Sequence, residues 1–412
     1  MRAQVVVIGG GAAGIAAAWH LHAAGHDVLL VEASQRLGGR AWSHLLAAPD
    51  GRSYTVDLGC GWLHSARRNP WVAIANHYGM TVDRRDAGWG EQWRNLGYSP
   101  AEQLAFAAAR QRWSDAAHAA LGGEDQPLSN FVAPDDPWRP QLDAISGYAN
   151  GAPLASVSLH DWAAYEDAAS DDNWTLPAGY GTLIERHAAD LPVRLGTSVT
   201  RIDRRGSALR LETSAGTIEA DRVVVAVPTT VLADEAITFD PPLPDKQVAA
   251  TALPLGIADK AFLHVDSPEW PADAHLIGNP RSACTASHRL SPWGLPIVES
   301  FFGGMCAEGL EDGDATAFAI DELVALLGSD WRRRLTPLHA TRWRHVAGIN
   351  GSYSHAEVGM AGQRLVLAAP VEGRLFFAGE ACHPHDFSTA HGAYETGIAA
   401  ATAVLASVAP PR

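Results

Sequence analysis

The chain has 412 residues, of which 47% are hydrophobic and 19% are charged. This length and composition predict two or three domains with a sizeable core and exclude a largely disordered chain. The net charge of −15 disfavours binding to nucleic acid and favours attraction of a cationic small molecule.

The cysteines and the apolar segments bear on location. The four cysteines, Cys60, Cys284, Cys306 and Cys382, lie far apart and form no CxxC pair. This spacing argues against a disulfide framework or a zinc site and favours a reducing compartment. No apolar run reaches the length of a membrane span, and the N-terminus is typical of a strand and not of a signal peptide. We therefore expect a cytoplasmic protein with no membrane partner and no bound metal.

The first 32 residues follow a strand, turn, helix, strand pattern. Gln4–Ile8 and Asp27–Val31 are apolar segments typical of buried strands, and the alanine-rich Ile15–Ala24 between them predicts a helix. Two strands joined by a helix within about 30 residues form a parallel βαβ unit, so the fold class is predicted to be α/β.

Helices and short strands follow along the rest of the chain. We predict helices at residues 70–78, 100–121, 179–191, 316–327 and 389–407. We predict strands at residues 193–195, 199–204, 208–213, 217–219, 222–227, 257–265, 276–278, 296–302 and 375–378. Segments typical of one βαβ-type domain occur at the start, middle and end, which predicts two interleaved domains. The first is expected from residues 1–80, 193–245 and 340–412, and the second, an α+β domain, from residues 81–192 and 246–339.

The turn between the first strand and helix has a dinucleotide-binding signature. Gly9, Gly11 and Gly14 are spaced as GxGxxG, which allows a tight turn, backbone approach to a pyrophosphate and close packing of helix on strand. Glu32, at the end of the second strand, can accept hydrogen bonds from ribose hydroxyls. Gly39 and Arg40 follow at a distance that suits contact with phosphate, and together these features favour FAD over NAD.

Ordered sequence blocks across the chain resemble the flavin-containing amine oxidases, the family of monoamine and polyamine oxidases. The blocks are IGGGAAG at 8–14, EASQRLGGR at 32–40, VDLGCGWLH at 56–64, LPLGIADKAFL at 253–263, RW at 342–343, NGSYS at 350–354 and FAGEACHPHDFSTAHGAYETG at 377–397. The resemblance, nearest to the polyamine oxidase branch, implies an FAD-binding Rossmann-like domain interleaved with an α+β substrate domain.

The resemblance also implies how FAD lies along the chain. Glu32 would meet the adenosine ribose, Val199 the adenine, and Glu380 the ribityl-phosphate region, while Gly61 and Trp62 would approach the isoalloxazine. The implied cofactor-binding residues are Gly9, Gly11, Ala13, Gly14, Glu32, Ala33, Gly39, Arg40, Gly61, Trp62, Val199, Trp343, Gly379, Glu380, Thr389 and Ala390. The helix that begins at the last two would direct its N–H groups and its dipole at the flavin N1–O2 edge.

Two residues match the family's catalytic positions. Lys260 matches a lysine that hydrogen-bonds a water near flavin N5, where it could assist reoxidation by oxygen. Tyr353 matches one wall of an aromatic cage around the substrate amine. The opposite wall is often a second tyrosine, and this chain has Thr389 at that place, which resembles the polyamine oxidases and widens the pocket. Ser352 stands where monoamine oxidases have the cysteine that links flavin, so FAD is expected to be noncovalent.

Other residues of these blocks concern the substrate, and its predicted binding residues are Trp62, His64 and Thr389. His64, after Trp62, matches a histidine near the second nitrogen of a polyamine, where neutral imidazole can accept from an ammonium. Arg67 and Arg68 depart from this picture, because two cations facing the pocket would repel a polyamine. His383 and His385 are assigned no chemistry.

The implied reaction is hydride transfer from an amine carbon to flavin N5, hydrolysis of the imine to a carbonyl, and reduction of O2 to hydrogen peroxide. An L-amino-acid oxidase remains an alternative, since Arg67 or Arg68 could bind a carboxylate. A flavin desaturase of a secondary-metabolite pathway is another. A non-catalytic FAD-binding scaffold is a third, although structure alone needs neither Lys260 nor Tyr353.

Overall fold

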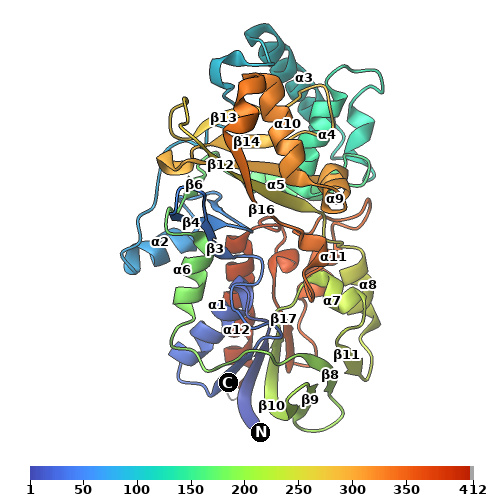
Figure 1. Ribbon diagram of the computed structural model, residues 1–412. Helices are drawn as coiled ribbons and strands as arrows, with labels where there is room; N and C mark the ends of the chain where they lie inside the picture. The colour runs from blue at the N-terminus through green and yellow to red at the C-terminus, as the bar shows by residue number, and fades with distance from the viewer. Residues whose placement is uncertain (409–412) are drawn as a thin grey trace.

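The computed structural model describes residues 1–408 and has two lobes (Figure 1). The first lobe is built on an eight-stranded sheet in the order β11-β8-β9-β10-β1-β2-β7, with β17 also paired to β10. β1, β2, β7, β10 and β17 run parallel, whereas β9 is antiparallel to both of its neighbours. The strands are β1 (Arg2–Ile8), β2 (Val28–Val31), β7 (Val193–Arg194), β8 (Val199–Asp203), β9 (Leu209–Thr213), β10 (Gly216–Val225), β11 (Thr238–Asp240) and β17 (Leu375–Phe377).

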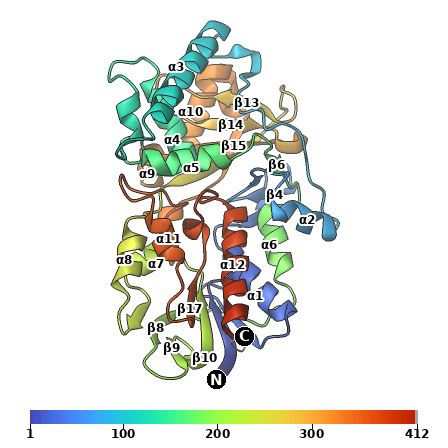
Figure 2. The same cartoon turned by 180° about the vertical axis from the view of Figure 1, so that it is seen from behind.

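Two helices from opposite ends of the sequence pack together in this lobe. α1 (Ala12–Ala23) and α12 (Ala390–Val408) lie side by side (Figure 2). A Cβ atom on Gly397 would lie 2.2 Å from the carbonyl oxygen of Ala13, so glycine is what permits this approach. The other helices of the lobe are α2 (Pro70–His77), α6 (Tyr180–His187), α7 (Thr229–Ala233), α8 (Pro244–Thr251) and α11 (Gln363–Ala368).

The second lobe is built on an antiparallel sheet in the order β13-β14-β15-β12-β16. Its strands are β12 (Ala258–Val265), β13 (Ala274–Ile277), β14 (Ser287–Leu290), β15 (Ile297–Gly303) and β16 (Leu335–Ala340). Its helices are α3 (Pro100–Ala119), α4 (Arg139–Asn150), α5 (Leu159–Ala168), α9 (Gly304–Glu311) and α10 (Ala315–Leu327). Two hairpins complete the fold, β3 (Ser43–Ala47) with β4 (Ser53–Asp57) and β5 (Trp62–Leu63) with β6 (Trp174–Thr175).

The predicted fold class is confirmed, with a parallel Rossmann-like sheet in one lobe and an antiparallel sheet in the other. The two strands predicted at 217–219 and 222–227 are wrong, because β10 runs unbroken through them. Asp221 lies within β10. Its charge does not interrupt β10, because its carboxylate accepts a hydrogen bond of 2.9 Å from Arg2 of the adjacent strand β1. The interleaved domain boundaries remain a prediction; α6, which they assign to the second domain, packs through Leu183 and Ile184 into the core around α1.

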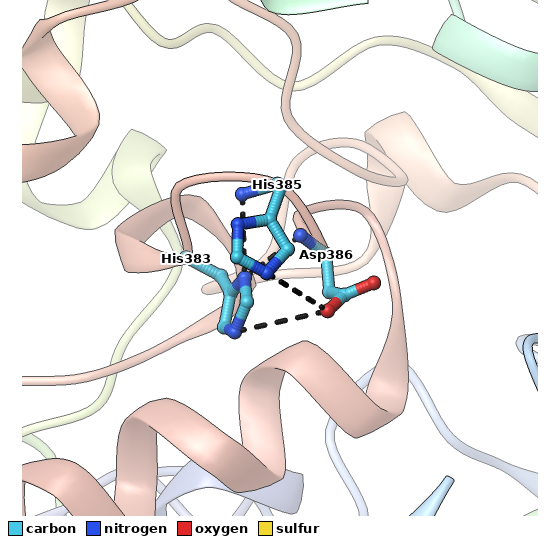
Figure 3. A group of neighbouring side chains, drawn as sticks. All are labelled: His383, His385 and Asp386. Atoms are coloured by element: carbon cyan, nitrogen blue, oxygen red, sulfur yellow. Dashed lines mark hydrogen bonds and ion pairs between the residues drawn. The ribbon is translucent and has the colours of Figure 1, made fainter. Parts of the chain in front are cut away.

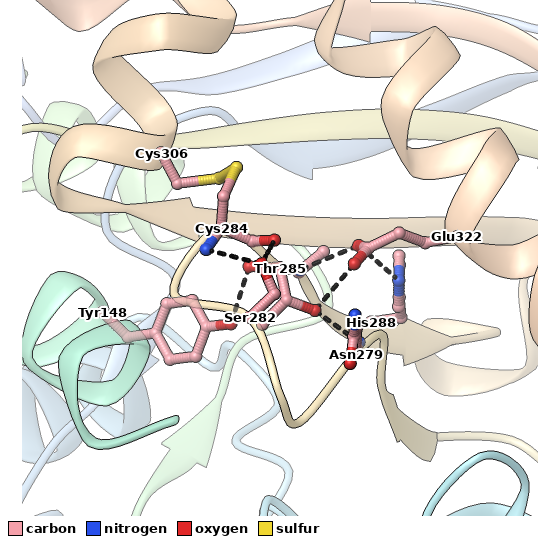
Figure 4. Close-up of a disulfide and its surroundings, with 9 residues drawn as sticks. Tyr148, Asn279, Ser282, Cys284, Thr285, His288, Cys306 and Glu322 are labelled. Atoms are coloured by element: carbon pink, nitrogen blue, oxygen red, sulfur yellow. Dashed lines mark hydrogen bonds and ion pairs between the residues drawn. A yellow bond between two sulfur atoms is a disulfide. The ribbon is translucent and has the colours of Figure 1, made fainter. Parts of the chain in front are cut away.

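The cysteine interpretation needs correction. Cys284 and Cys306, 22 residues apart, form a disulfide that joins the β13–β14 loop to α9 (Figure 4). This disulfide was not expected, because neither cysteine belongs to a CxxC motif. The two cysteines meet only when the β13–β14 loop folds against α9. This disulfide removes the reason to expect a reducing compartment. None of the described helices is both long and apolar enough to cross a membrane.

Candidate active site

The glycine turn after β1 has the geometry that its spacing predicts. Gly9 has a φ of +103°, and a Cβ atom there would lie 2.4 Å from the carbonyl oxygen of Ala226. A Cβ atom on Gly14 would lie 1.9 Å from the carbonyl oxygen of Gly9. Both contacts are too short for a side chain, so the tight turn and the helix packing require glycine at these positions.

The middle glycine leaves an open cradle. A Cβ atom on Gly11 would meet nothing within 4 Å, and the first turn of α1 has neither a side-chain cap nor an acidic residue. The amide of Gly38 donates to the carbonyl of Gly10 at 2.8 Å, which brings Gly39 and Arg40 beside this turn. Free N–H groups at a helix N-terminus, with open space before them, fit the pyrophosphate of FAD.

Glu32 lies at the end of β2, beside the same turn. Its carboxylate accepts hydrogen bonds from the amides of Gly10 at 2.6 Å and Ser34 at 2.8 Å. The amide of Thr197 donates to the carbonyl of Glu32 at 2.8 Å, so the segment that leads into Val199 and β8 runs alongside. The predicted adenosine-binding residues therefore lie together, with Ala33 exposed next to them.

Arg40 and Glu380 form a partly buried ion pair. The guanidinium Nη1 of Arg40 donates to Glu380 Oε1 at 2.8 Å and to the carbonyl of Ser352 at 2.7 Å. Burial alone would raise the pKa of the Glu380 carboxyl, but Arg40 and Arg364, with hydrogen bonds from Ser354 and Ser388, outweigh this and lower it. Glu380 thus stays ionised next to Gly379, and it fixes the position of the Arg40 guanidinium.

Lys260 reaches from the second lobe into the first. Its Nζ donates to the carbonyl of Asp57 at 2.9 Å and lies 2.8 Å from Glu299 Oε1. A Cβ atom on Gly61 would be 3.4 Å from Nζ, so the structure brings the predicted catalytic lysine beside a residue predicted to face the flavin. The carboxyl of Asp57 is buried, which raises its pKa despite hydrogen bonds from Ser43 and Tyr180.

Trp343 and Ser352, two further residues singled out in the sequence, are both buried. Trp343 donates from Nε1 to the carbonyl of Leu58 at 3.1 Å. The Ser352 hydroxyl donates to the carbonyl of Ala258 and accepts from its amide, both at 2.8 Å. Burial raises the pKa of the Cys60 and Cys382 thiols to about 12, so neither thiol is activated as a nucleophile.

Tyr353 is held by its hydroxyl. It donates to the carbonyl of Tyr148 on α4. The hydroxyl of Tyr148 in turn donates to the carbonyl of Thr285 at 2.8 Å, next to Cys284 of the disulfide (Figure 4). Burial raises the Tyr353 pKa, so the phenol is neutral and its ring is fixed in orientation.

Thr389 has a structural role that the sequence interpretation did not include. Its hydroxyl donates to the carbonyl of Asp386 at 2.6 Å and accepts from the amide of Gly392 at 3.0 Å, which is the geometry of a helix cap. The residue is 6% exposed. The start of α12 is held in turn by Trp71, whose Nε1 donates to the carbonyl of Ala390 at 3.1 Å. The wall role of Thr389 stays a prediction.

His64 lies in a cluster of aromatic rings. Its Nδ1 is 2.7 Å from Asn173 Oδ1, and the Asn173 amide group donates to the carbonyl of Asp171 at 3.0 Å. Because the amide oxygen faces the ring, Nδ1 bears the proton and Nε2 keeps a lone pair. Burial lowers the pKa of His64 to about 4, against the opposing effect of Asn173. The Trp89 ring packs against both His64 and Trp62.

The two arginines after His64 differ in their surroundings. Arg68 binds the Asp386 carboxylate through both terminal nitrogens, at 2.7 and 2.5 Å. The Asp386 side chain is 3% exposed and also lies 3.1 Å from His391 Nε2. Arg67 is exposed and donates from its amide to Asp172 at 2.5 Å. The charge of Arg68 is therefore neutralised within the protein.

His383, His385 and Asp386 bring their ligand atoms within 4.8 Å of one another (Figure 3). His383 Nδ1 accepts from the Asp386 amide at 2.7 Å, and its Nε2 lies 3.0 Å from Glu395. Nε2 of His383 thus bears a proton and offers no lone pair to a cation. Arg68 already occupies Asp386, so the group fits a hydrogen-bond network better than a metal site.

Sequence reasoning missed several residues of this region. Glu299 pairs with Lys260, Asn173 with His64, and Asp386 with Arg68. Asp386 stands inside the FAGEACHPHDFSTAHG block, which could have singled it out. No local signal marks the other two, because their partners are distant in sequence.

The open glycine turn, the carboxylate at the end of β2 and the uncapped helix define a dinucleotide-binding α/β protein. The flavin-containing amine oxidoreductase family matches residues 12–115 and 117–405. The chain belongs to that family and is an FAD-dependent enzyme, which confirms the resemblance and the class of reaction predicted.

Known proteins similar to the chain include plant oxidases. Polyamine oxidase 2 of Arabidopsis thaliana is 29% identical over 437 residues, with 97% of this chain and 87% of that protein covered. Polyamine oxidase 4 of Oryza sativa subsp. japonica is 30% identical over 438 residues, with 97% and 88% covered. The structure of a putrescine oxidase bound to putrescine superposes with a TM-score of 0.77 at 20% identity, covering 98% of this chain and 99% of that one. This last likeness shows that the two share the amine oxidase fold.

Proposed function

We propose that the chain oxidises a polyamine or long aliphatic amine, with O2 as the electron acceptor. The observation that supports this substrate class best is the neutral His64, whose Nε2 lone pair can accept from an inner ammonium group. The net charge of −15 attracts polycations over longer range. Relatives named polyamine oxidases point in the same direction.

Each predicted site residue has a task in this proposal. The ring of Tyr353 flanks the reacting amine, and its orientation is fixed by Tyr148. His64 accepts from the second nitrogen of the substrate and so sets which carbon lies at the reacting position. FAD held at the glycine turn, Glu32 and Arg40 would supply the transfer of two electrons from the amine to O2, with hydrogen peroxide as product. Lys260 donates to a water beside the cofactor. No side chain has to remove a proton when the bound amine is neutral.

The ion pair of Arg68 bears on the L-amino-acid oxidase alternative. A guanidinium that binds Asp386 through two nitrogens has little left to offer a substrate carboxylate, and the same pairing removes its repulsion of a polyamine. A desaturase remains the second candidate, since it would use the same cofactor. A non-catalytic scaffold would need no buried lysine at Gly61.

A peroxide assay over a panel of amines tests the proposal. The panel contains a polyamine, a long aliphatic diamine, a monoamine of equal length, an arylalkylamine and L-amino acids. We expect the polyamine or diamine to have the highest kcat/KM. A clear preference for an amino acid, or flavin reduction without peroxide, would overturn it in favour of the alternatives.

Three further points belong to the proposal. FAD is bound noncovalently, which the hydroxyl at Ser352 and the buried thiols support. The domains divide near the predicted boundaries, with α6 packed into the core of the first lobe. The protein works in the cytoplasm.

A further inference from the structure

The neighbour of Lys260 in the second lobe is a carboxylate. Lys260 is one of only two lysines in the chain. The register of β12 and β15 pairs Lys260 with Phe301 and Phe262 with Glu299, so Glu299 is a diagonal neighbour of Lys260 on the same face of the sheet. The lysine and glutamate side chains are 7% and 15% exposed, and Oε1 lies 2.8 Å from Nζ.

The Lys260 ammonium has three N–H groups, and two oxygen atoms lie close to it. It donates to the carbonyl of Asp57 at 2.9 Å, and Glu299 Oε1 forms an ion pair with it at 2.8 Å. A Cβ atom on Gly61 would lie 3.4 Å from Nζ, so the residue beside the ammonium on this side has no side chain. A buried lysine readily loses its proton, and an opposite charge within about 4 Å counteracts that loss.

Other titratable groups near Lys260 do not replace Glu299. The Asp57 carboxyl is turned to the backbone of α6, where it accepts from Tyr180 at 3.0 Å. The Cys60 thiol is neutral because burial raises its pKa to about 12. Arg289 of β14, which lines the same cavity, is bound to Asp273 at 2.9 and 2.5 Å.

We propose that Glu299 is the positioning residue for Lys260: it keeps the side chain an ammonium and fixes its direction, so that the remaining N–H points to the flavin side. The proposal rests on the proposed function only in assigning Lys260 to the cofactor. It predicts that removing the charge of Glu299 impairs reoxidation through Lys260 and leaves amine binding unchanged.

The first test needs no turnover. Protein labelled with ¹³Cε-lysine has two side-chain signals, and Lys260→Met assigns them. In Glu299→Gln the pH midpoint of the Lys260 signal should fall by about one unit or more. Glu308→Gln, which removes an exposed carboxylate bound to Arg344 at 3.1 Å, is the matched control and should leave the midpoint unchanged.

The second test follows reoxidation of photoreduced holoenzyme by O2 in stopped flow, without any amine. Glu299→Gln should slow reoxidation at least about tenfold, as Lys260→Met does, and the double variant should be no slower than Lys260→Met alone. An unchanged midpoint, an unchanged reoxidation rate, or a weaker amine affinity with normal reoxidation overturns the proposal. If wild-type protein fails to oxidise any amine, the proposed function fails, whereas these two measurements still decide the role of Glu299.

Discussion

Replacing His64 by alanine tests the substrate class at the residue that supports it. The wild-type imidazole is held through Nδ1 by Asn173 at 2.7 Å, and its pKa of about 4 leaves Nε2 unprotonated at neutral pH. Leaving a buried polar group of the substrate without its partner costs about 1–3 kcal/mol. If the transition state loses this contact, the same cost is added to the barrier. We therefore expect kcat/KM for a polyamine to fall about 5- to 150-fold.

The comparison substrate makes this assay specific. A monoamine of equal length has no inner ammonium group, so its kcat/KM should be largely spared by His64→Ala. His64→Gln retains an acceptor and should recover part of the loss. Because protonation would occur only near pH 4, the wild-type kcat/KM should show no inflection from this residue between pH 6 and 8. Equal losses on polyamine and monoamine would refute the contact and favour the alternative substrates.

Four further predictions concern the cofactor and the fold. Lys260→Met should keep FAD bound but slow its reoxidation by O2 at least about tenfold, near 1.4 kcal/mol in barrier; unchanged stopped-flow reoxidation would make the lysine purely structural. Acid precipitation should release yellow flavin into the supernatant, because Ser352 replaces a linking cysteine, and flavin in the pellet would contradict this. Gly11→Ala should leave the melting temperature of apoprotein unchanged while weakening FAD binding, whereas Gly14→Ala, with a Cβ atom 1.9 Å from a carbonyl oxygen, should lower that temperature. Cys306→Ser should lower the free energy of unfolding by about 3 kcal/mol, the loop-closure value for a separation of 22 residues; denaturation with and without reductant measures it.

The βαβ unit at the start of the chain could be predicted from the residues of one short segment. Gly14 is constrained by the carbonyl of Gly9 within the same turn, and Gly9 by its φ of +103°, so their spacing alone predicts the βαβ unit. The close contact of Gly9 with Ala226, just after β10, comes from a distant part of the chain. The strand β16 was missed for an equally local reason. It contains Pro337, which argues against a central strand, but β16 lies at the edge of its sheet, where a proline is tolerated.

Pairings across the sequence could not be predicted in this way. Asn173 lies 109 residues from His64, and Glu299 meets Lys260 only through the register of two antiparallel strands. The disulfide likewise depends on where α9 begins relative to the β13–β14 loop. A single sequence contains the partners but not the distances between them, so it singled out Lys260 and His64 but not Glu299 and Asn173, which hold them.

The charged side chains around the site form ion pairs, and this pairing affects how the site could distinguish one amine from another. Arg40 is paired with Glu380, Arg68 with Asp386, and Lys260 with Glu299. These three cations are thereby neutralised, and Arg67 lies exposed at the surface. In the proposed function, recognition falls to a neutral imidazole and a tyrosine ring, which discriminate by position and not by net charge. The long-range field of an acidic chain would then speed the arrival of any cationic amine, while the spacing between His64 and Tyr353 would select among amines.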